Sequence, residues 1–350
     1  MTFFFSLRAY VLGVVYKVVR RWVIAFFYLK QTVLFQKHDL EPAVEFGDKL
    51  YACLYRYFRR LVFVNAIPKG IGVDFCGLHF PSPFTFAAFK SDMSLIQAWL
   101  DLGMGGGCVK TLMLEPRVGN PRPRLLEIKQ DGKKGLINAL GLPGPGIESA
   151  CEQVKRHHLA RYKRPIGFSI GGGSSQEYFV LFKKVIAFCK EEGLSNIYVE
   201  LNLSCPNTED GQALLENTGD VIRLIALFRE HSSCALGIKL APHLKDSVLL
   251  DYATRLKGYK NVFLNCGNTQ MMAHQGISVA RGGLSGEPLF KRSLAIAKLL
   301  KPIGVPLMIT GGITKFEHIQ ALKQEGVSLF GLATALIENP FQLVIWNQRV

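Results

Sequence analysis

The most constraining feature of this chain is a repeated alternation of short apolar runs and amphipathic helical patterns after about residue 70. Eight runs have the length and composition of buried β-strands, and most are followed by a segment with helical periodicity. They span residues 83–89, 107–113, 165–172, 196–203, 235–240, 261–265, 306–310 and 328–332. Eight strand–helix units favour closure into an α/β (β/α)8 TIM barrel over an open doubly wound sheet.

The helical patterns between the runs are clearest at residues 176–190, 218–231 and 314–325. Residues 114–136 interrupt the alternation with a GNPRPR stretch and an Asp-Gly turn, which predicts a short hairpin at the barrel mouth. We therefore expect a catalytic barrel domain over residues 68–350 and an N-terminal helical extension over residues 1–67.

The extension carries much of the charge imbalance. The whole chain has 42 Lys+Arg against 27 Asp+Glu, a net charge of +15, whereas residues 1–37 contain no acid. The basic residues of this stretch are Arg8, Lys17, Arg20, Arg21, Lys30 and Lys37. They lie among Phe, Tyr, Trp, Val and Leu, so anionic lipid is the first partner to expect and nucleic acid the second.

Residues 9–29 are long enough to span a bilayer, but three cations interrupt their centre. Lys17, Arg20 and Arg21 each cost about 2.5–3.5 kcal/mol there, and their spacing places them on one helix face. This pattern favours a helix lying in the membrane interface over a spanning anchor or a buried soluble helix. We expect a membrane-associated protein, peripheral or N-terminally anchored, with its catalytic domain in the cytoplasm or facing the compartment of the pathway it serves.

A second helix is predicted over residues 40–64, where Leu50, Leu54, Tyr57 and Leu61 recur at helical spacing. Arg56, Arg59 and Arg60 lie between them. The pattern fits a docking helix with a solvated face, and it fits equally a helical pair lying on lipid.

Polar side chains follow several predicted strands at their carboxyl ends, the end of a barrel that carries the chemistry. These are Lys110, Asn202, Lys239 and Asn268. Cys205 lies on the loop after the fourth run, flanked by Asn202 and Asn207, and could act as nucleophile or general base. No Cys or His stands at ligand spacing, so no metal is expected. The other cysteines, expected to be small buried hydrophobes, are Cys53, Cys76, Cys108, Cys151, Cys189, Cys234 and Cys266.

Three glycine clusters follow the sixth, seventh and eighth predicted strands. They are residues 282–286, residues 311–312, and Gly331 ahead of Ala333 and Thr334. Loops after the last strands of barrels frequently bind phosphate through backbone N–H groups. The joint placement implies a phosphorylated cofactor.

The motifs ELNLSCPNT, GNPRPRL, INALGLP, GIKLAP, LNCGNT, GGLSG, ITGGI and ATAL resemble, in this order, those of dihydroorotate dehydrogenases. The resemblance covers about residues 70–345. It implies an FMN enzyme that oxidises dihydroorotate to orotate in de novo pyrimidine (UMP) biosynthesis. Cys205 matches the base that removes a proton from C5 of dihydroorotate while C6 passes hydride to flavin N5.

The resemblance also implies the remaining site residues. Substrate-binding groups would be Lys110, Asn138, Asn202, Asn207, Asn268 and Thr269. Cofactor-binding groups would be Ala87, Ala88, Lys110, Thr111, Asn138, Ser169, Asn202, Lys239, Gly286, Gly311, Gly312, Ala333 and Thr334. Lys239 matches the lysine beside the N1–C2=O edge of the flavin, where a cation favours the reduced anionic form.

The chain mixes two classes of this family. The cysteine base and Lys110 resemble the soluble class, which uses fumarate, NAD or another soluble acceptor. The hydrophobic extension resembles that of the membrane class, which reduces quinone. That class differs from this chain at three positions: it has serine as the base, tyrosine where this chain has Ala333, and histidine where this chain has Val44. Phe89 stands where the family usually has glycine. We expect quinone as acceptor, with a soluble acceptor as the alternative.

Two other functions compete with this one. A tRNA dihydrouridine synthase also joins an FMN barrel to a catalytic cysteine, but places RNA-binding bulk after the barrel, whereas this sequence stops soon after Phe341. The basic cluster Lys155, Arg156, Arg161, Lys163 and Arg164 is better explained as a solvated helix face, so no nucleic acid is expected. A degenerate membrane-bound scaffold is the non-enzymatic alternative, which the retained Asn, Cys and Lys set disfavours.

Overall fold

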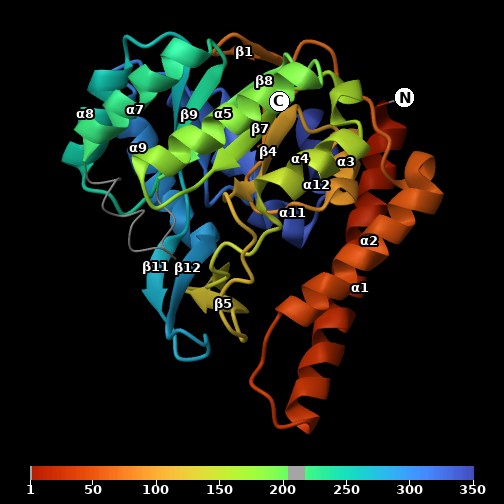
Figure 1. Ribbon diagram of the computed structural model, residues 1–350. Coiled ribbons are helices and arrows are strands. Elements are labelled where there is room, and N and C mark those ends of the chain that lie inside the picture. The colour runs from red at the N-terminus through yellow and green to blue at the C-terminus, as the bar shows by residue number, and fades with distance from the viewer. Residues whose placement is uncertain (1, 204–216) are drawn as a thin grey trace.

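The computed structural model describes residues 2–203 and 217–350. Its centre is a closed barrel of eight parallel strands in chain order, in which the last strand pairs with the first (Figure 1). The strands are β3 (Phe84–Phe86), β4 (Gly106–Leu112), β7 (Ile166–Ile170), β8 (Ile197–Asn202), β9 (Ala235–Leu240), β10 (Val262–Cys266), β13 (Leu307–Thr310) and β14 (Leu329–Leu332). Each coincides with one of the eight predicted runs, so the predicted TIM barrel is confirmed.

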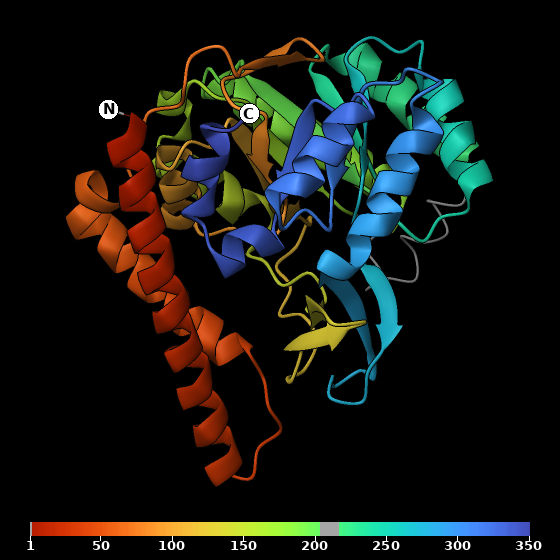
Figure 2. The ribbon, with the colours of Figure 1, turned by 180° about the vertical axis from the view of Figure 1, so that it is seen from behind.

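Helices cover the outside of the barrel on both sides (Figures 1 and 2). They are α3 (Met93–Asp101), α4 (Gly146–Arg156), α5 (Ser175–Glu191), α7 (Thr218–His231), α8 (Asp246–Leu256), α9 (Phe290–Leu300), α10 (Phe316–Gln324), α11 (Thr334–Glu338) and α12 (Gln342–Asn347). Two 3-10 turns, η1 (Leu159–Tyr162) and η2 (Glu287–Leu289), join them. The three predicted helical patterns correspond to α5, α7 and α10. In α5, Tyr178, Leu181 and Phe182 are buried at helical spacing, which holds the helix against the barrel.

An antiparallel sheet projects from the carboxyl end of the barrel, in the order β11-β12-β6-β5 (Figure 1). Its strands are β5 (Leu125–Gln130), β6 (Lys133–Asn138), β11 (Gln270–Ala273) and β12 (Arg281–Gly286). The predicted hairpin is β5–β6, whose turn residues Asp131 and Gly132 have φ of 49° and 74°, as a tight hairpin turn requires. The glycine cluster 282–286, grouped with loop glycines in the sequence analysis, forms strand β12, and Gly286 ends that strand. A Cβ at Gly283 would lie 2.1 Å from Thr269 Oγ1, so only glycine permits this packing.

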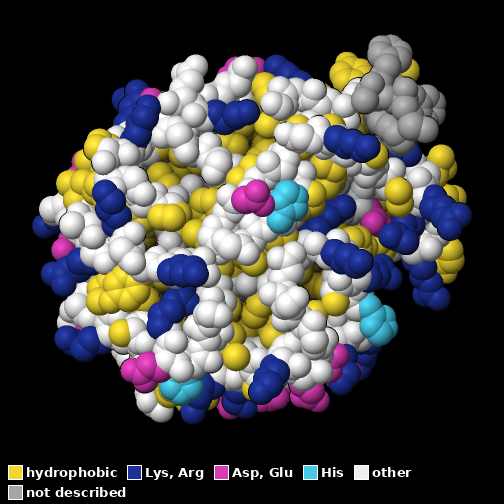
Figure 3. All heavy atoms as spheres, turned by 90° about the horizontal axis from the view of Figure 1, so that it is seen from above, with side chains coloured by type: hydrophobic (Ala, Val, Ile, Leu, Met, Phe, Trp, Pro, Cys, Tyr) yellow, Lys and Arg dark blue, Asp and Glu magenta, His cyan; other side chains and the backbone are white. Residues whose placement is uncertain are grey.

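A small hairpin closes the amino end of the barrel. It consists of β1 (Val73–Phe75) and β2 (Leu78–Phe80). Phe75 and Phe80 pack with Tyr198 and Phe263 in an apolar cluster at this end. Figure 3 views the molecule from this side, where Lys and Arg side chains are scattered over the face instead of forming one stripe.

The extension forms two long helices that lie along the barrel and reach beyond it, α1 (Thr2–Val33) and α2 (Glu41–Val62) (Figures 1 and 2). Tyr16 on α1 donates its hydroxyl to the carbonyl of Ile337 at 2.9 Å. On α2, the Tyr55 hydroxyl donates to Asp101 Oδ2 at 2.8 Å. Both helices are therefore anchored to the barrel by specific contacts.

The structure corrects two expectations for this extension. Lys17 and Arg21 are exposed, but Arg20 turns toward the barrel and pairs with Glu127 of β5, so the three cations do not share one exposed face. Cys53 is exposed on α2, so its predicted burial was wrong. The exposed side of α2 includes Leu50, Tyr57 and Leu61, whereas its buried residues are Ala43, Tyr51 and Tyr55. Within the described residues, none of the helices combines the length and apolar character needed to cross a bilayer.

Candidate active site

A cavity of about 420 Å³ lies at the carboxyl ends of the barrel strands. Residues from strand ends, from β6 and β12, and from α2 contribute to its walls. The sequence-predicted residues that line it are Ala87, Ala88, Lys110, Thr111, Asn138, Asn202, Lys239, Asn268, Thr269, Gly286, Gly311, Gly312, Ala333 and Thr334. The fold thus brings together residues that are up to about 250 positions apart in the sequence.

Three side-chain amides form a polar wall of this cavity. Asn202 Nδ2 donates to Thr111 Oγ1 at 2.8 Å, and Asn268 Nδ2 donates to Asn202 Oδ1 at 3.3 Å. Asn138 Nδ2 donates to the carbonyl of Gly283 at 3.2 Å. Ser169 does not line the cavity: it is fully buried behind Thr111, with their hydroxyls 3.0 Å apart. These contacts fix the orientation of the three amide groups in the cavity wall.

Two lysines face the same cavity with different surroundings. Burial, together with the nearby charges of Lys90 and Arg124, lowers the pKa of Lys110 from 10.5 to about 8. Lys239 is buried beside Glu200, with Nζ 3.6 Å from Oε1. The cavity therefore holds Lys239, which is paired with a buried carboxylate, and Lys110, whose pKa is lowered.

A glycine-rich cradle forms another part of the wall. Gly311 and Gly312 have φ of 125° and 76°, and a Cβ at Gly312 would lie 2.3 Å from the backbone N of Phe290. Within the described part of the chain, the buried Thr310 Oγ1 has no hydrogen-bond partner. A tight glycine cradle beside an unsatisfied hydroxyl fits an anionic phosphate, whose oxygens accept from hydroxyl and backbone donors. The donor set therefore fits the phosphorylated cofactor predicted from the sequence.

Two predicted residues, Cys205 and Asn207, lie outside the described residues. Asn202 and Leu203, which precede them in the chain, are buried at the end of β8. Among residues 2–203 and 217–350, no group of three or more His, Cys, Asp or Glu side chains is placed to hold a metal ion.

A second cavity, of about 350 Å³, lies between the two extension helices and the barrel. Its lining is mostly apolar and includes Leu12, Val23, Leu54 and Trp99. Sequence reasoning missed this cavity, because it forms only where helices and barrel meet. The residues that line both cavities are Leu40, Val44, Asp48, Phe89, Lys90 and Ile337. The two cavities are therefore neighbours that share a wall.

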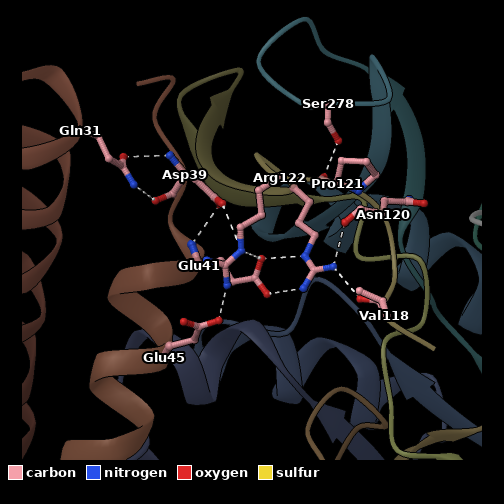
Figure 4. A network of polar contacts seen from close by, with 10 residues as sticks. Gln31, Asp39, Glu41, Glu45, Val118, Asn120, Pro121, Arg122 and Ser278 are labelled. Carbon is pink, nitrogen blue, oxygen red and sulfur yellow. Dashed lines mark hydrogen bonds and ion pairs between the residues drawn. The ribbon is translucent and has the colours of Figure 1, made fainter. Parts of the chain in front are cut away.

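An ionic network ties the extension to the GNPRPR loop at the mouth of the first cavity (Figure 4). Arg124 Nε and Nη2 donate to the two carboxylate oxygens of Glu41 at 2.7 and 2.8 Å, and Arg122 Nε donates to Glu41 at 3.0 Å. Arg122 also pairs with Glu45. The motif is visible in the sequence, but its partners on α2 are not.

Comparison with known proteins identifies the family. The family model described as dihydroorotate dehydrogenase matches residues 71–345. The chain belongs to the dihydroorotate dehydrogenase family. A dihydroorotate dehydrogenase (quinone) of Thermus thermophilus is 31% identical over 280 residues, covering 76% of this chain and 78% of that protein.

Further members agree with this placement. A dihydroorotate dehydrogenase (quinone) of Brucella abortus is 32% identical over 286 residues, covering 76% of each chain. The crystal structure of the Eimeria tenella dihydroorotate dehydrogenase in complex with ferulenol superposes with a TM-score of 0.70 at 22% identity. It covers 87% of this chain and 89% of that chain, which supports the fold. The family as a whole consists of flavoenzymes.

Proposed function

We propose that this protein oxidises dihydroorotate to orotate with FMN, as a step of de novo pyrimidine biosynthesis. The observation that carries the proposal is the convergence of strand-end amides, two lysines and a glycine cradle on one cavity. Bound FMN would supply the hydride-accepting centre. Gly286, Gly311, Gly312 and Thr334 would hold its phosphate, and Lys239 would lie at its ring system.

The chain's own side chains would bind and orient the substrate. Dihydroorotate carries a carboxylate and a ring of amide groups, which match the donors and acceptors of Asn138, Asn202 and Asn268. Protonated Lys110 adds a charge-assisted donor for the carboxylate. Cys205, by resemblance, would take the proton from C5, since a thiolate is a competent base near its pKa.

We propose quinone as the electron acceptor, bound in the apolar cavity between the extension and the barrel. Support comes from its apolar lining, from the wall it shares with the first cavity, and from the quinone-dependent relatives. A soluble acceptor, fumarate or NAD, is the second candidate, because Cys205 and Lys110 resemble the soluble class.

We also propose that the extension lies on the membrane surface. Support comes from large apolar side chains exposed on α1, among them Trp22 (74%), Phe26 (63%) and Leu29 (65%). Contiguous exposed apolar surface of this kind marks an interaction site, and the exposed Lys17 and Arg21 suit anionic lipid.

The test is spectroscopic. Purified protein should be yellow, and anaerobic dihydroorotate should bleach its flavin absorbance. Cys205→Ser should slow this bleaching and move its pH dependence upward, because an alcohol is the weaker acid. Reoxidation by ubiquinone, fumarate and NAD, compared side by side, identifies the acceptor. Purified protein that contains no flavin, or whose flavin absorbance does not change on addition of dihydroorotate, would contradict the proposal.

A further inference from the structure

Glu200 lies in the interior of the barrel, directly below the floor of the first cavity. It precedes Asn202 by two positions on β8, so both side chains point inward, and Asn202 lines the cavity. The Glu200 side chain is 1% exposed and that of Lys239 is 7% exposed. A buried carboxylate therefore stands immediately behind the buried lysine of the site.

Three neighbouring strands build this arrangement. Glu200 on β8 has Oε1 3.6 Å from Lys239 Nζ on β9, and its Oε2 accepts a hydrogen bond of 2.6 Å from Asn265 Nδ2 on β10. The strand register places Asn202 and Asn265 on either side of Lys239. Asn265 is itself 1% exposed, so the carboxylate is held from two sides by buried groups.

The surroundings of Glu200 on the other side are apolar or neutral. Tyr198 and Phe263 belong to the apolar cluster at the amino end of the barrel. Burial first, and the negative charge of Glu200 second, raise the pKa of the Cys108 thiol, so this neighbour stays uncharged. Lys239 is thus the cation that compensates Glu200.

A buried ion pair rarely stabilises a fold more than apolar side chains of the same volume, but removing one partner is costly. The stability of the barrel alone therefore does not account for this pair. Lysine has a long flexible side chain, and a fixed carboxylate limits where its ammonium group can lie. The carboxylate also offsets part of the positive charge that the lysine presents to the cavity.

We propose that Glu200 is a positioning residue for Lys239. It holds the ammonium group at the cavity floor and partly compensates its positive charge, and in this way it sets the reduction potential of the bound flavin. This inference rests on the proposed function, in which the cavity holds FMN. A cation beside the flavin favours the reduced form, and a neighbouring anion weakens that effect.

The test is the midpoint potential of the protein-bound flavin, measured by spectroelectrochemistry. Glu200→Gln keeps the shape and an acceptor for Asn265 but removes the charge. It should raise the equilibrium constant for two-electron reduction at least about tenfold, or about 30 mV. Lys239→Met should move the potential in the opposite direction. In a Lys239→Met background, Glu200→Gln should produce a smaller shift, because the part of the effect that comes from holding the ammonium group is lost.

Several outcomes would overturn the inference. One is an unchanged or lowered potential in Glu200→Gln, and another is an equal shift in the Lys239→Met background. The matched control is Asp101→Asn, which removes a carboxylate buried against Arg59 outside the cavity and should leave the potential unchanged. An equal shift in this control would show a general effect of the substitution and would count against the inference.

A second variant covers the case in which Glu200→Gln does not retain flavin. The double change Glu200→Leu with Lys239→Met replaces the ion pair by apolar side chains, which barrel interiors tolerate. Its potential should differ from that of Lys239→Met alone by less than about 30 mV, the shift expected when the lysine is present, and a difference that large would contradict the inference. Wild-type protein without flavin would contradict the proposed function and this inference together, whereas flavin-loaded wild type with an unshifted variant contradicts this inference alone.

Discussion

Phe89 stacks on Trp99, with the ring centroids 5.3 Å apart and the ring planes 24° apart. Phe89 lines both cavities, whereas Trp99 lines only the apolar one. The stacked pair therefore forms part of the wall that separates the two cavities. The family resemblance implies glycine at this position, and glycine has no side chain that could form such a stack.

We expect Phe89→Gly to open this wall. The half-buried ring should cost about 2 kcal/mol of unfolding free energy when removed. Flavin reduction by dihydroorotate should stay within about twofold, while reoxidation by a bulky quinone should become faster, because the wall no longer separates the two sites. Stopped-flow measurement of the two half-reactions separates these effects. Slower reduction with unchanged reoxidation would show that Phe89 instead shapes the flavin cavity.

The titration of Lys110 predicts a pH dependence of substrate binding. Its pKa is lowered to about 8, chiefly by burial, so the ammonium group loses its proton as pH rises through this value. Binding of an anionic ligand should weaken above about pH 8, by roughly 10- to 100-fold for a lost charge-assisted hydrogen bond. The affinity for orotate can be measured by titrating the protein with orotate and following the flavin absorbance, at pH values from 6 to about 10. Lys110→Met should bind weakly at every pH, and a wild-type pH profile in that variant would contradict the assignment.

The Glu41–Arg124 ion pair predicts that the extension contributes to the stability of the barrel. Both side chains are mostly buried, at 13% and 12% exposure. Arg124→Met should lower the unfolding free energy by about 2 kcal/mol, as for hydrogen bonds to charged groups. Urea unfolding followed by tryptophan fluorescence measures the loss. The exposed Arg56→Met is the matched control and should change stability by less than about 0.5 kcal/mol.

The same pair predicts an acid-dependent loss of stability. Burial alone would raise the pKa of Glu41, but the hydrogen bonds and charges of Arg124 and Arg122 outweigh it and lower the pKa below 4.5. The stabilisation is therefore complete above about pH 4.5 and is lost as pH falls through the folded-state pKa. The stability difference between wild type and Glu41→Gln should shrink below that pH. A difference independent of pH would contradict the ion pair as its source.

The exposed face of α1 predicts the lipid dependence of the protein. Replacing Trp22, Phe26 and Leu29 with Gln should weaken binding to anionic vesicles at least about a hundredfold. Burying the apolar surface of each side chain in the lipid would contribute about 1.5 kcal/mol to the free energy of binding. Vesicle co-sedimentation measures the binding. The control is Val118→Gln, at a residue 88% exposed on the barrel-mouth loop, which should bind like wild type. Equal binding by the triple variant would place the lipid contact elsewhere.

The strand–helix alternation was enough to predict the barrel, because strand burial and helix amphipathicity are local periodic patterns. The polar residues at strand ends were likewise readable, since parallel strands bring their carboxyl ends to one side. Lys110, Asn202, Lys239 and Asn268, predicted from four separate units, line one cavity. Their chemical roles came from the family resemblance and stay proposals.

Other features depend on side-chain contacts between distant segments, which no local pattern encodes. The pairing of Arg20 with Glu127, the pairing of Glu41 with Arg124, and the pairing of β12 with β6 join residues at least about 80 positions apart. The apolar cavity and the buried Glu200–Lys239 pair exist only after barrel and helices have packed. The sequence by itself determined the barrel and which residues face its mouth. The tertiary structure alone decided which charges are paired, because pairing depends on distances and burial that form only on folding.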